Sequence, residues 1–164
     1  MGEPDGAMPE TSFLTVESPI GPLTLTARAD ALAALDWADP GETPIEPISP
    51  LLTEAARQIA AYFAGRARSF DLPLAPQGTP FHARVWHAIA EIPFGAHETY
   101  GALAARLGTG ARAVGRAAGA NPLPIIVPCH RVLGAGARLH GYSGRGGIAA
   151  KAALLRLEGN SPSG

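Results

Sequence analysis

The sequence contains a single cysteine, Cys129, among its 164 residues. One thiol excludes an intrachain disulfide and any zinc site built from several cysteines. No HExxH pattern occurs, and the histidines show no spacing typical of metal ligands. We therefore expect no metal site and no cofactor, and a hydrophobic core that forms without cross-links.

Long apolar runs are also missing. No segment approaches the roughly 20 apolar residues that span a bilayer as a helix. The acidic N-terminus, residues 1–10, lacks the apolar segment of a signal peptide. Together with the lone thiol, these absences predict a protein of the reducing cytoplasm with no membrane partner.

The chain has little net charge, since 13 Lys and Arg against 14 Asp and Glu give −1. Its charges are nonetheless unevenly placed. Residues 1–78 hold 11 acidic residues and 4 arginines, giving −7, whereas residues 79–164 hold 9 basic and 3 acidic residues, giving +6. A basic half beside an acidic half predicts a polyanion bound on one side. An accidental segregation of solvated charges is the alternative.

The first half shows the strand and helix patterns of a small α+β domain. Ser49 is a typical N-cap residue and Pro50 suits the first helical position, so a helix is expected from there to Gly65. Its apolar residues recur on one face. Three strands precede it, and they are predicted near residues 13–16, 23–26 and 32–37.

The second half is predicted to be mainly helical. Thr79 caps a helix that reaches Ile92 before Pro93, and Thr99 caps a shorter helix over Tyr100–Leu107. The glycine turn at residues 108–110 leads into another helix over residues 111–118, which makes a helix-turn-helix. The α+β chain then divides into a disordered N-terminus (1–10), an α+β domain (11–72), a linker (73–78), a helix-turn-helix domain (79–159) and a flexible tail (160–164).

The second helix of this motif is built from small residues and two arginines, Arg112 and Arg116. Helices that read base edges in the major groove carry long polar side chains, and this one offers few. Its small residues suit either tight packing against another helix or a close approach to a narrow groove. Within a basic half, we favour binding to the minor groove with little sequence readout.

The only cysteine lies in a stiff segment, Asn121 to Val132, with the sequence NPLPIIVPCHRV. Three prolines before Cys129 fix φ and remove backbone donors. The β-branched run Ile125–Val127 predicts a short buried strand. A thiol at the end of such a segment is placed as a nucleophile would be, whereas a packed, unreactive thiol is the alternative.

This segment resembles the active-site signature of the alkylguanine-DNA alkyltransferases, which repair alkylated guanine. Two downstream motifs, Gly141–Gly144 (GYSG) and Leu154–Gly159 (LLRLEG), resemble the same family in the same order. The resemblance implies stoichiometric, irreversible transfer of an alkyl group from O6 of guanine to Cys129, with O4 of thymine as a further candidate substrate. It also implies a monomer that binds double-stranded DNA through the minor groove and flips the damaged base.

The resemblance assigns roles to individual residues. Cys129 is the acceptor, and His130 acts on it through a water while Glu158 holds the histidine. Tyr142 donates to the guanine as charge develops, and Asn121 braces the junction between helix and active-site segment. The remaining contacts to substrate or DNA are expected from Tyr100, Arg112, Arg116, Val127, Ser143 and Arg131. Arg145 interrupts the paired glycines of the family and leaves the shape of the pocket rim open.

Glu158 is unusual for a physical reason as well. It lies in the last turn of a helix predicted from about Gly147, where a carboxylate opposes the negative end of the helix dipole. A buried glutamate there needs a donor, and His130 is the best candidate.

Two other classes of protein fit part of the pattern. A helix-turn-helix regulator with an incidental cysteine would bind DNA reversibly and by sequence. A cysteine hydrolase would turn over an acyl substrate, although the sequence shows no oxyanion-hole motif.

Overall fold

The structure is a computed structural model that describes residues 11–37, 49–139 and 147–160. The predicted disordered N-terminus, the end of the chain beyond Asn160 and the GYSG motif with Tyr142 and Ser143 lie outside the described residues. So does Arg145. Within the described ranges, no helix combines the length and the apolar character needed to cross a membrane.

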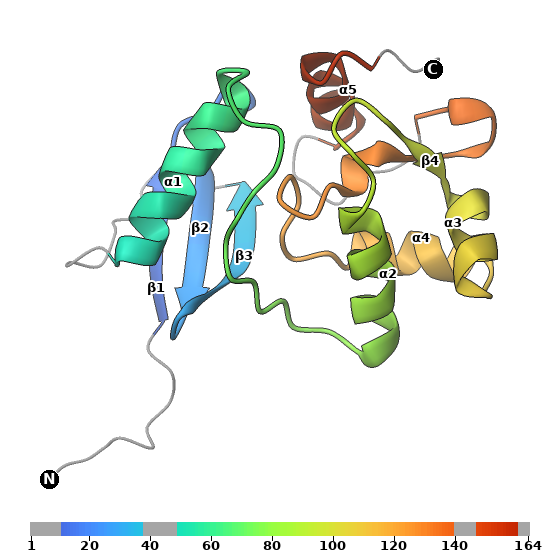
Figure 1. The fold of residues 1–164 in the computed structure, drawn as a ribbon, viewed down its shortest axis with the longest axis horizontal. Helices are drawn as coiled ribbons and strands as arrows, with labels where there is room; N and C mark the ends of the chain where they lie inside the picture. Colours follow the sequence, from blue (N-terminus) through green and yellow to red (C-terminus); the bar gives the residue numbers. More distant parts are fainter. Residues whose placement is uncertain (1–10, 38–48, 140–146, 161–164) are drawn as a thin grey trace, which may run out of the picture.

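The first half forms an antiparallel sheet covered by one helix (Figure 1). Strands β1 (Thr11–Val16), β2 (Leu23–Arg28) and β3 (Ala31–Trp37) follow one another in sheet order, as the alternation predicted. Helix α1 (Pro50–Phe63) packs on this sheet, and its contacts are densest with β2. This confirms the α+β assignment of the first half.

Helix α1 begins and ends where the sequence predicted. The Ser49 hydroxyl accepts a hydrogen bond from the Leu52 amide at 3.1 Å, and Pro50 occupies the first turn. Gly65, with φ of 78°, follows the last turn. The buried face of the helix includes Tyr62, which the apolar pattern had not identified.

The first residues of the predicted linker (residues 73–78) pair with strand β3 at Leu32. The Leu32 amide donates to the Pro73 carbonyl at 2.8 Å, and the Ala75 amide donates to the Leu32 carbonyl at 2.8 Å. Leu74 thus pairs with β3 before the chain leaves for the second half.

The second half is mainly helical. Helix α2 (Pro80–Ala90) ends two residues before Ile92, which is nonetheless buried as predicted. Two parallel two-residue strands, β4 (Glu98–Thr99) and β5 (Val132–Leu133), pair with each other and so join distant parts of this half. The remaining elements are α3 (Tyr100–Leu107), α4 (Ala111–Gly119), the 3₁₀ helices η1 (Cys129–Arg131) and η2 (Ala135–Ala137), and α5 (Gly147–Leu157).

Helices α3 and α4 form the predicted helix-turn-helix. Gly108 ends α3 in the left-handed region at φ 69° and ψ 37°, which a residue with a Cβ adopts at a cost. Helix α2 supports the pair through two side chains. The Trp86 indole donates to the Ala117 carbonyl at 2.8 Å, and Arg84 donates to the Leu107 carbonyl at 2.9 Å.

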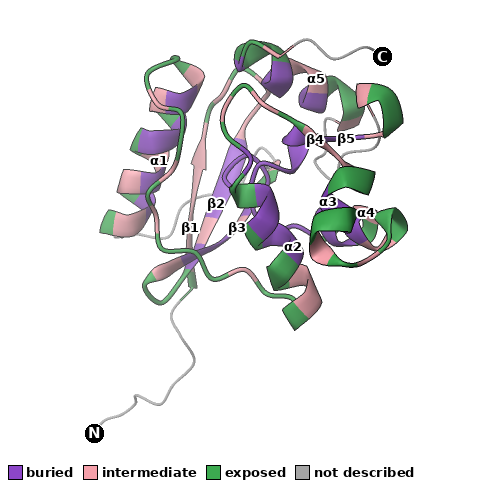
Figure 2. Cartoon of the chain, turned by 45° about the vertical axis from the view of Figure 1, so that its right-hand side comes forward, coloured by how far each residue is buried: buried purple, intermediate pink, exposed green. Residues whose placement is uncertain are grey.

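Buried residues from both halves form one continuous core (Figure 2). A backbone hydrogen bond crosses between the halves, since the Leu35 amide of β3 donates to the Pro122 carbonyl at 2.8 Å. The segment that precedes Cys129 is therefore held against the sheet of the first half.

The prediction of a strand at Ile125–Val127 is wrong. These residues form a tight turn in which the Val127 amide donates to the Leu123 carbonyl at 2.8 Å. Ile125 has a φ of 77°, which is rare for a β-branched residue. A strand needs regularly spaced amide donors, and the prolines at 122, 124 and 128 remove them. The run is buried as expected, but by packing and not by sheet pairing.

Candidate active site

Cys129 is the first residue of η1, directly after Pro128. Pro128 has φ −80° and ψ 65°, and the Cys129 amide donates to the Val127 carbonyl at 2.7 Å, which makes an inverse γ-turn. Cys129 is 96% buried. The proline-rich segment therefore delivers the thiol on a tight, fixed turn instead of at the end of a strand.

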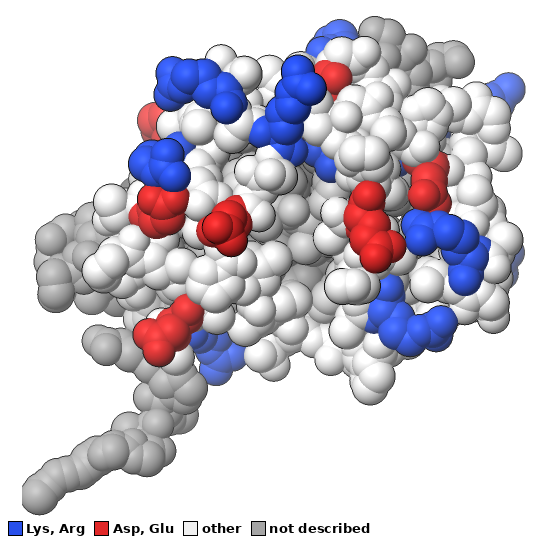
Figure 3. All heavy atoms as spheres, in the orientation of Figure 1, with Lys and Arg blue, Asp and Glu red and all other residues white. Residues whose placement is uncertain are grey.

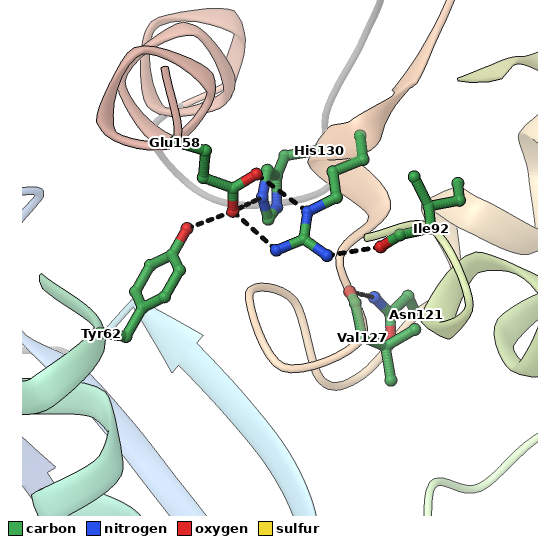
Figure 4. Close-up of polar contacts among 7 residues, drawn as sticks. Tyr62, Ile92, Asn121, Val127, His130 and Glu158 are labelled. Atoms are coloured by element: carbon green, nitrogen blue, oxygen red, sulfur yellow. Dashed lines mark hydrogen bonds and ion pairs between the residues drawn. The ribbon is translucent and has the colours of Figure 1, made fainter. Parts of the chain in front are cut away.

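Asn121 links the helix-turn-helix to this turn (Figure 4). It follows α4, and its side-chain amide donates to the Cys129 sulfur at 3.3 Å and to the Val127 carbonyl at 2.9 Å. Its oxygen accepts from the Leu123 amide at 2.9 Å. Asn121 thus lies at the predicted junction and also contacts the sulfur itself.

Val127 is expected to contact the substrate, and the family resemblance implies that a carbonyl near it accepts from the exocyclic amine of guanine. The Val127 carbonyl already accepts from Asn121 and from the Cys129 amide. Because a carbonyl oxygen has two lone pairs, a further donor would have to displace one of these two.

His130 and Glu158 form the predicted pair. His130 Nε2 lies 2.7 Å from Glu158 Oε2, and both side chains are fully buried. The other ring nitrogen, Nδ1, has no hydrogen-bond partner among the described residues. A carboxylate can only accept, so Nε2 carries the proton and Nδ1 keeps its lone pair. The imidazole is thus set up as a base at Nδ1.

Glu158 gathers hydrogen bonds from three side chains, His130, Arg131 and Tyr62 (Figure 4). Burial alone would raise the pKa of Glu158, but the hydrogen bonds from His130 and Arg131 outweigh it and lower that pKa to about 2. The carboxylate is therefore ionised throughout the neutral range. Burial lowers the pKa of His130, and the attraction of Glu158 opposes this only in part.

The backbone around Glu158 ends α5 in a Schellman motif. The Gly159 amide donates to the Arg156 carbonyl at 3.0 Å, and the Asn160 amide donates to the Leu155 carbonyl at 2.8 Å. Gly159 has φ 79°, a conformation that glycine adopts without strain. This ending turns the Glu158 side chain inward, so the unfavourable helix dipole is offset by buried donors.

The prediction that Arg131 contacts DNA is not supported. Its side chain is 93% buried, and its guanidinium makes two hydrogen bonds with Glu158 at 2.9 Å each. It also donates to the Ile92 carbonyl at 2.6 Å and stacks on the Phe94 ring at 5.9 Å. Arg131 therefore serves as the internal countercharge of the Glu158 carboxylate, which also binds the adjacent His130.

Sequence reasoning missed a buried lysine in α5. Lys151 is fully buried, and its amine lies 3.4 Å from the Tyr100 hydroxyl and 5.5 Å from the centre of the Tyr100 ring. Burial lowers the pKa of Lys151 to about 8, although the nearby Cys129 charge opposes this. A signal was present, because Lys151 lies two turns before Glu158 on the face that buries Leu154.

The family resemblance implies that Tyr100 presses on a phosphate beside the target base. It begins α3 and is half-buried, and its hydroxyl faces Lys151 inside the protein. Burial, and next the Cys129 charge, raise the pKa of Tyr100 to about 12.

Arg112 and Arg116 both lie on the exposed side of α4, one turn apart. The same side carries Gly115 and Gly119, where an added Cβ would meet nothing within 4 Å. Glycine inside a helix costs up to about 1 kcal/mol relative to alanine. Internal packing therefore does not require these two glycines, whereas Ala117 and Ala118 on the opposite side of α4 are buried in the core.

Two domain models of one protein family together match almost all of the described residues. Residues 80–160 match the model of the 6-O-methylguanine DNA methyltransferase DNA-binding domain, and residues 13–76 match the ribonuclease-like domain of the same enzyme. The chain belongs to the 6-O-methylguanine DNA methyltransferase family. A Methanosarcina acetivorans methylated-DNA–protein-cysteine methyltransferase is 46% identical over 156 residues, covering 90% of this chain and 98% of the relative.

Solved structures of this methyltransferase family share the fold. The crystal structure of Mycobacterium tuberculosis O6-methylguanine methyltransferase superposes with a TM-score of 0.79 at 42% identity, covering 94% of this chain and 97% of that one. The crystal structure of Mycobacterium tuberculosis OGT in complex with DNA gives a TM-score of 0.79 at 44% identity, over 92% and 95% of the two chains. The α+β fold class predicted from the sequence is thereby confirmed.

Proposed function

We propose that this methyltransferase-family protein repairs DNA by moving an alkyl group from O6 of guanine to Cys129. A new bond forms between the Cys129 sulfur and the alkyl carbon while the bond from that carbon to O6 breaks. The electron pair of the broken bond passes to guanine, and the product is an S-alkylcysteine. The buried thiol that accepts a hydrogen bond from Asn121, next to a histidine with an open Nδ1, carries this proposal.

The thiol must lose its proton before it attacks, because the thiolate is the nucleophile. His130 Nδ1 is the base that takes this proton, through one water as the family resemblance implies. Glu158 then faces an imidazolium across the 2.7 Å contact and stabilises it. The amide of Asn121 and the positive charge of Lys151 favour the thiolate. Tyr142 and Ser143 complete the guanine site in this proposal, as the same resemblance implies.

Binding of double-stranded DNA is assigned to α4, as in the minor-groove readers. Gly115 and Gly119 leave room for a sugar-phosphate wall, and Arg112 and Arg116 lie on the same side. On the face shown in Figure 3, both acidic and basic side chains occur over each half, so the charge separation along the sequence does not produce two uniform surfaces there. We therefore propose a local contact along α4, made by a monomer.

The compartment follows from the chemistry. The acceptor must stay a reduced thiol until it meets damage, and the cytoplasm maintains that state. We propose a cytoplasmic protein on this basis.

Stoichiometric capture tests the proposed function. Because Cys129 is the acceptor and no second cysteine can relieve it, each molecule should react once with a methylguanine duplex. Intact-mass and peptide analysis should find one methyl group per chain, on the Cys129 peptide. An unmethylated duplex is the control. Several turnovers per molecule would favour a hydrolase, and reversible binding without a mass change would favour a regulator.

Base extrusion is tested by Arg112→Ala. If Arg112 fills the space left by the flipped base, its loss shifts extrusion and not displacement. Transfer from a duplex should slow ~10- to 100-fold, equivalent to ~1.4–2.7 kcal/mol. Reaction with free benzylguanine should stay nearly unchanged. Equal slowing on both substrates contradicts the role of Arg112 in extrusion.

Arg116→Ala is the matched comparison, one turn further along α4. As a phosphate contact, Arg116 should affect affinity for all DNA equally. Its loss should reduce the dependence of the logarithm of the binding constant on the logarithm of salt concentration by about one unit.

A further inference from the structure

One contact links the first half of the chain to the proposed catalytic relay. The Tyr62 hydroxyl, at the end of α1, donates to Glu158 Oε2 at 2.6 Å across 96 positions of sequence. Tyr62 is fully buried. Burial, together with the hydrogen bond to Glu158, raises the pKa of Tyr62, so the phenol stays protonated and acts as the donor. A hydrogen bond this short to a carboxylate belongs to the strong, charge-assisted kind.

The oxygen that Tyr62 binds is the one that binds His130. Oε2 receives His130 Nε2 at 2.7 Å and Arg131 Nη2 at 2.9 Å, besides the Tyr62 hydroxyl. Three donors share the lone pairs of a single atom, so each donor weakens the hold of Oε2 on the others. The strength of the Tyr62 hydrogen bond therefore affects how strongly Glu158 attracts the proton on His130.

We propose that Tyr62 is a positioning residue for alkyl transfer, which fixes Glu158 Oε2 and limits its pull on His130 so that the imidazole stays neutral. This rests on the proposed function, in which His130 Nδ1 takes the thiol proton. It gives the sheet-and-helix half of the protein a direct part in the reaction, through one hydroxyl group.

The direction of the expected change follows from the groups that face His130. Burial, Arg131 and Lys151 lower the pKa of His130, and Glu158 raises it. Cys129, its neighbour in η1, supplies the proton. Removing the Tyr62 hydroxyl leaves Oε2 with two donors, so Glu158 attracts the histidine proton more strongly and the pKa of His130 rises. A doubly protonated His130 cannot act as a base, so transfer should be lost at a higher pH than in the parent.

The ring of Tyr62 is held independently of its hydroxyl. Phe63 packs edge-on at 5.2 Å between ring centres, Phe70 lies at 5.5 Å and Phe94 at 6.2 Å. Phenylalanine at position 62 retains this packing. Tyr62→Phe therefore removes one hydrogen bond and leaves the aromatic cluster.

The experiment measures Tyr62→Phe in two ways. Single-turnover reaction of the full chain with free benzylguanine is followed against pH, and the His130 ring is titrated by NMR. Both the acid limb of the rate profile and the His130 titration should move up by about 0.5–1 pH unit, which is ~3- to 10-fold in rate below the limb. Site-specific 3-fluorotyrosine at position 62 is a stronger donor of the same shape, and it should move both downward.

Phe70→Leu is the matched control, because it loosens the packing around Tyr62 but keeps the hydroxyl. It should lower the melting temperature and leave both pH midpoints in place. Unchanged midpoints in Tyr62→Phe and in the fluorotyrosine protein, or an equal shift in Phe70→Leu, would overturn the proposal. So would a shifted His130 titration with an unmoved rate profile. If the parent transfers no alkyl group, the proposed function fails, and the His130 titration alone still reports the coupling.

Discussion

Cys129→Ala is expected to abolish alkyl transfer completely while DNA binding stays within about twofold of the parent. Cys129 supplies the only thiol in the chain, and the residue is 96% buried. Its loss removes one weak hydrogen bond from Asn121. The exposed side of α4, which we assign to DNA, contains no part of the Cys129 turn. The Cys129→Ala protein should therefore lose alkyl transfer and keep DNA binding.

The measurement pairs intact mass after incubation with a methylguanine duplex and a binding titration with the same duplex. Cys129→Ser is the matched variant, because its hydroxyl keeps a polar group near Asn121 but is a far weaker nucleophile than a thiolate. Both variants should bind and neither should gain mass. Loss of binding in a variant that retains the parent circular dichroism spectrum would show that the sulfur supports the DNA site.

Glu158→Gln should cause the largest loss of stability. The carboxylate neutralises Arg131 inside the protein, and removing one partner of a buried ion pair typically costs about 3–5 kcal/mol. Because the pKa of Glu158 in the folded protein is about 2, below its usual 4.5, its contribution is present above pH 4.5 and is lost as pH falls toward 2. In the Glu158→Gln protein, the part of the free energy of unfolding that is lost between pH 4.5 and 2 because Glu158 takes up a proton should be absent.

The same change should slow transfer by ~10²- to 10⁴-fold, the range for loss of general base catalysis. A neutral glutamine stabilises an imidazolium poorly. Its amide can also donate to His130 Nε2, which moves the ring proton to Nδ1 and removes the lone pair that the reaction needs. Urea denaturation reports the stability, and rates are compared well below the melting transition.

Glu54→Gln is the control for the loss of a carboxylate. Glu54 pairs with Arg57 on the exposed side of α1, where screening by water makes an ion pair weak. It should change neither stability nor rate appreciably. A Glu158→Gln protein with the parent stability and pH–rate profile would show that Glu158 is an ordinary residue at a helix end.

Local signals in the sequence predicted the ends of helices correctly wherever a single residue determines the backbone conformation. Ser49, Thr79 and Thr99 cap the helices as predicted, because each hydroxyl needs only the amide three residues on. Gly108 turns α3 into α4 because it adopts a left-handed conformation without strain. The order of motifs around Cys129 also identified the family.

The prediction at Ile125–Val127 is wrong because the supply of backbone donors, and not the hydrophobic pattern, decides the structure there. A buried β-branched run suits a strand, yet the prolines around it leave too few amides for pairing. The chain instead folds back on itself, and this places Cys129 on a turn beside Asn121.

The proposed relay shows what only the tertiary structure decided. The sequence by itself determined that a thiol, a histidine and a glutamate occur in the order typical of this family. It also predicted that His130 and Glu158 form a pair. Nothing local could show that Arg131 turns inward, that the Lys151 amine meets the Tyr100 hydroxyl, or that Tyr62 reaches Glu158 from the other half of the chain. Each of these depends on a polar group losing water, and a polar group loses water only when distant segments pack over it and supply its hydrogen bonds.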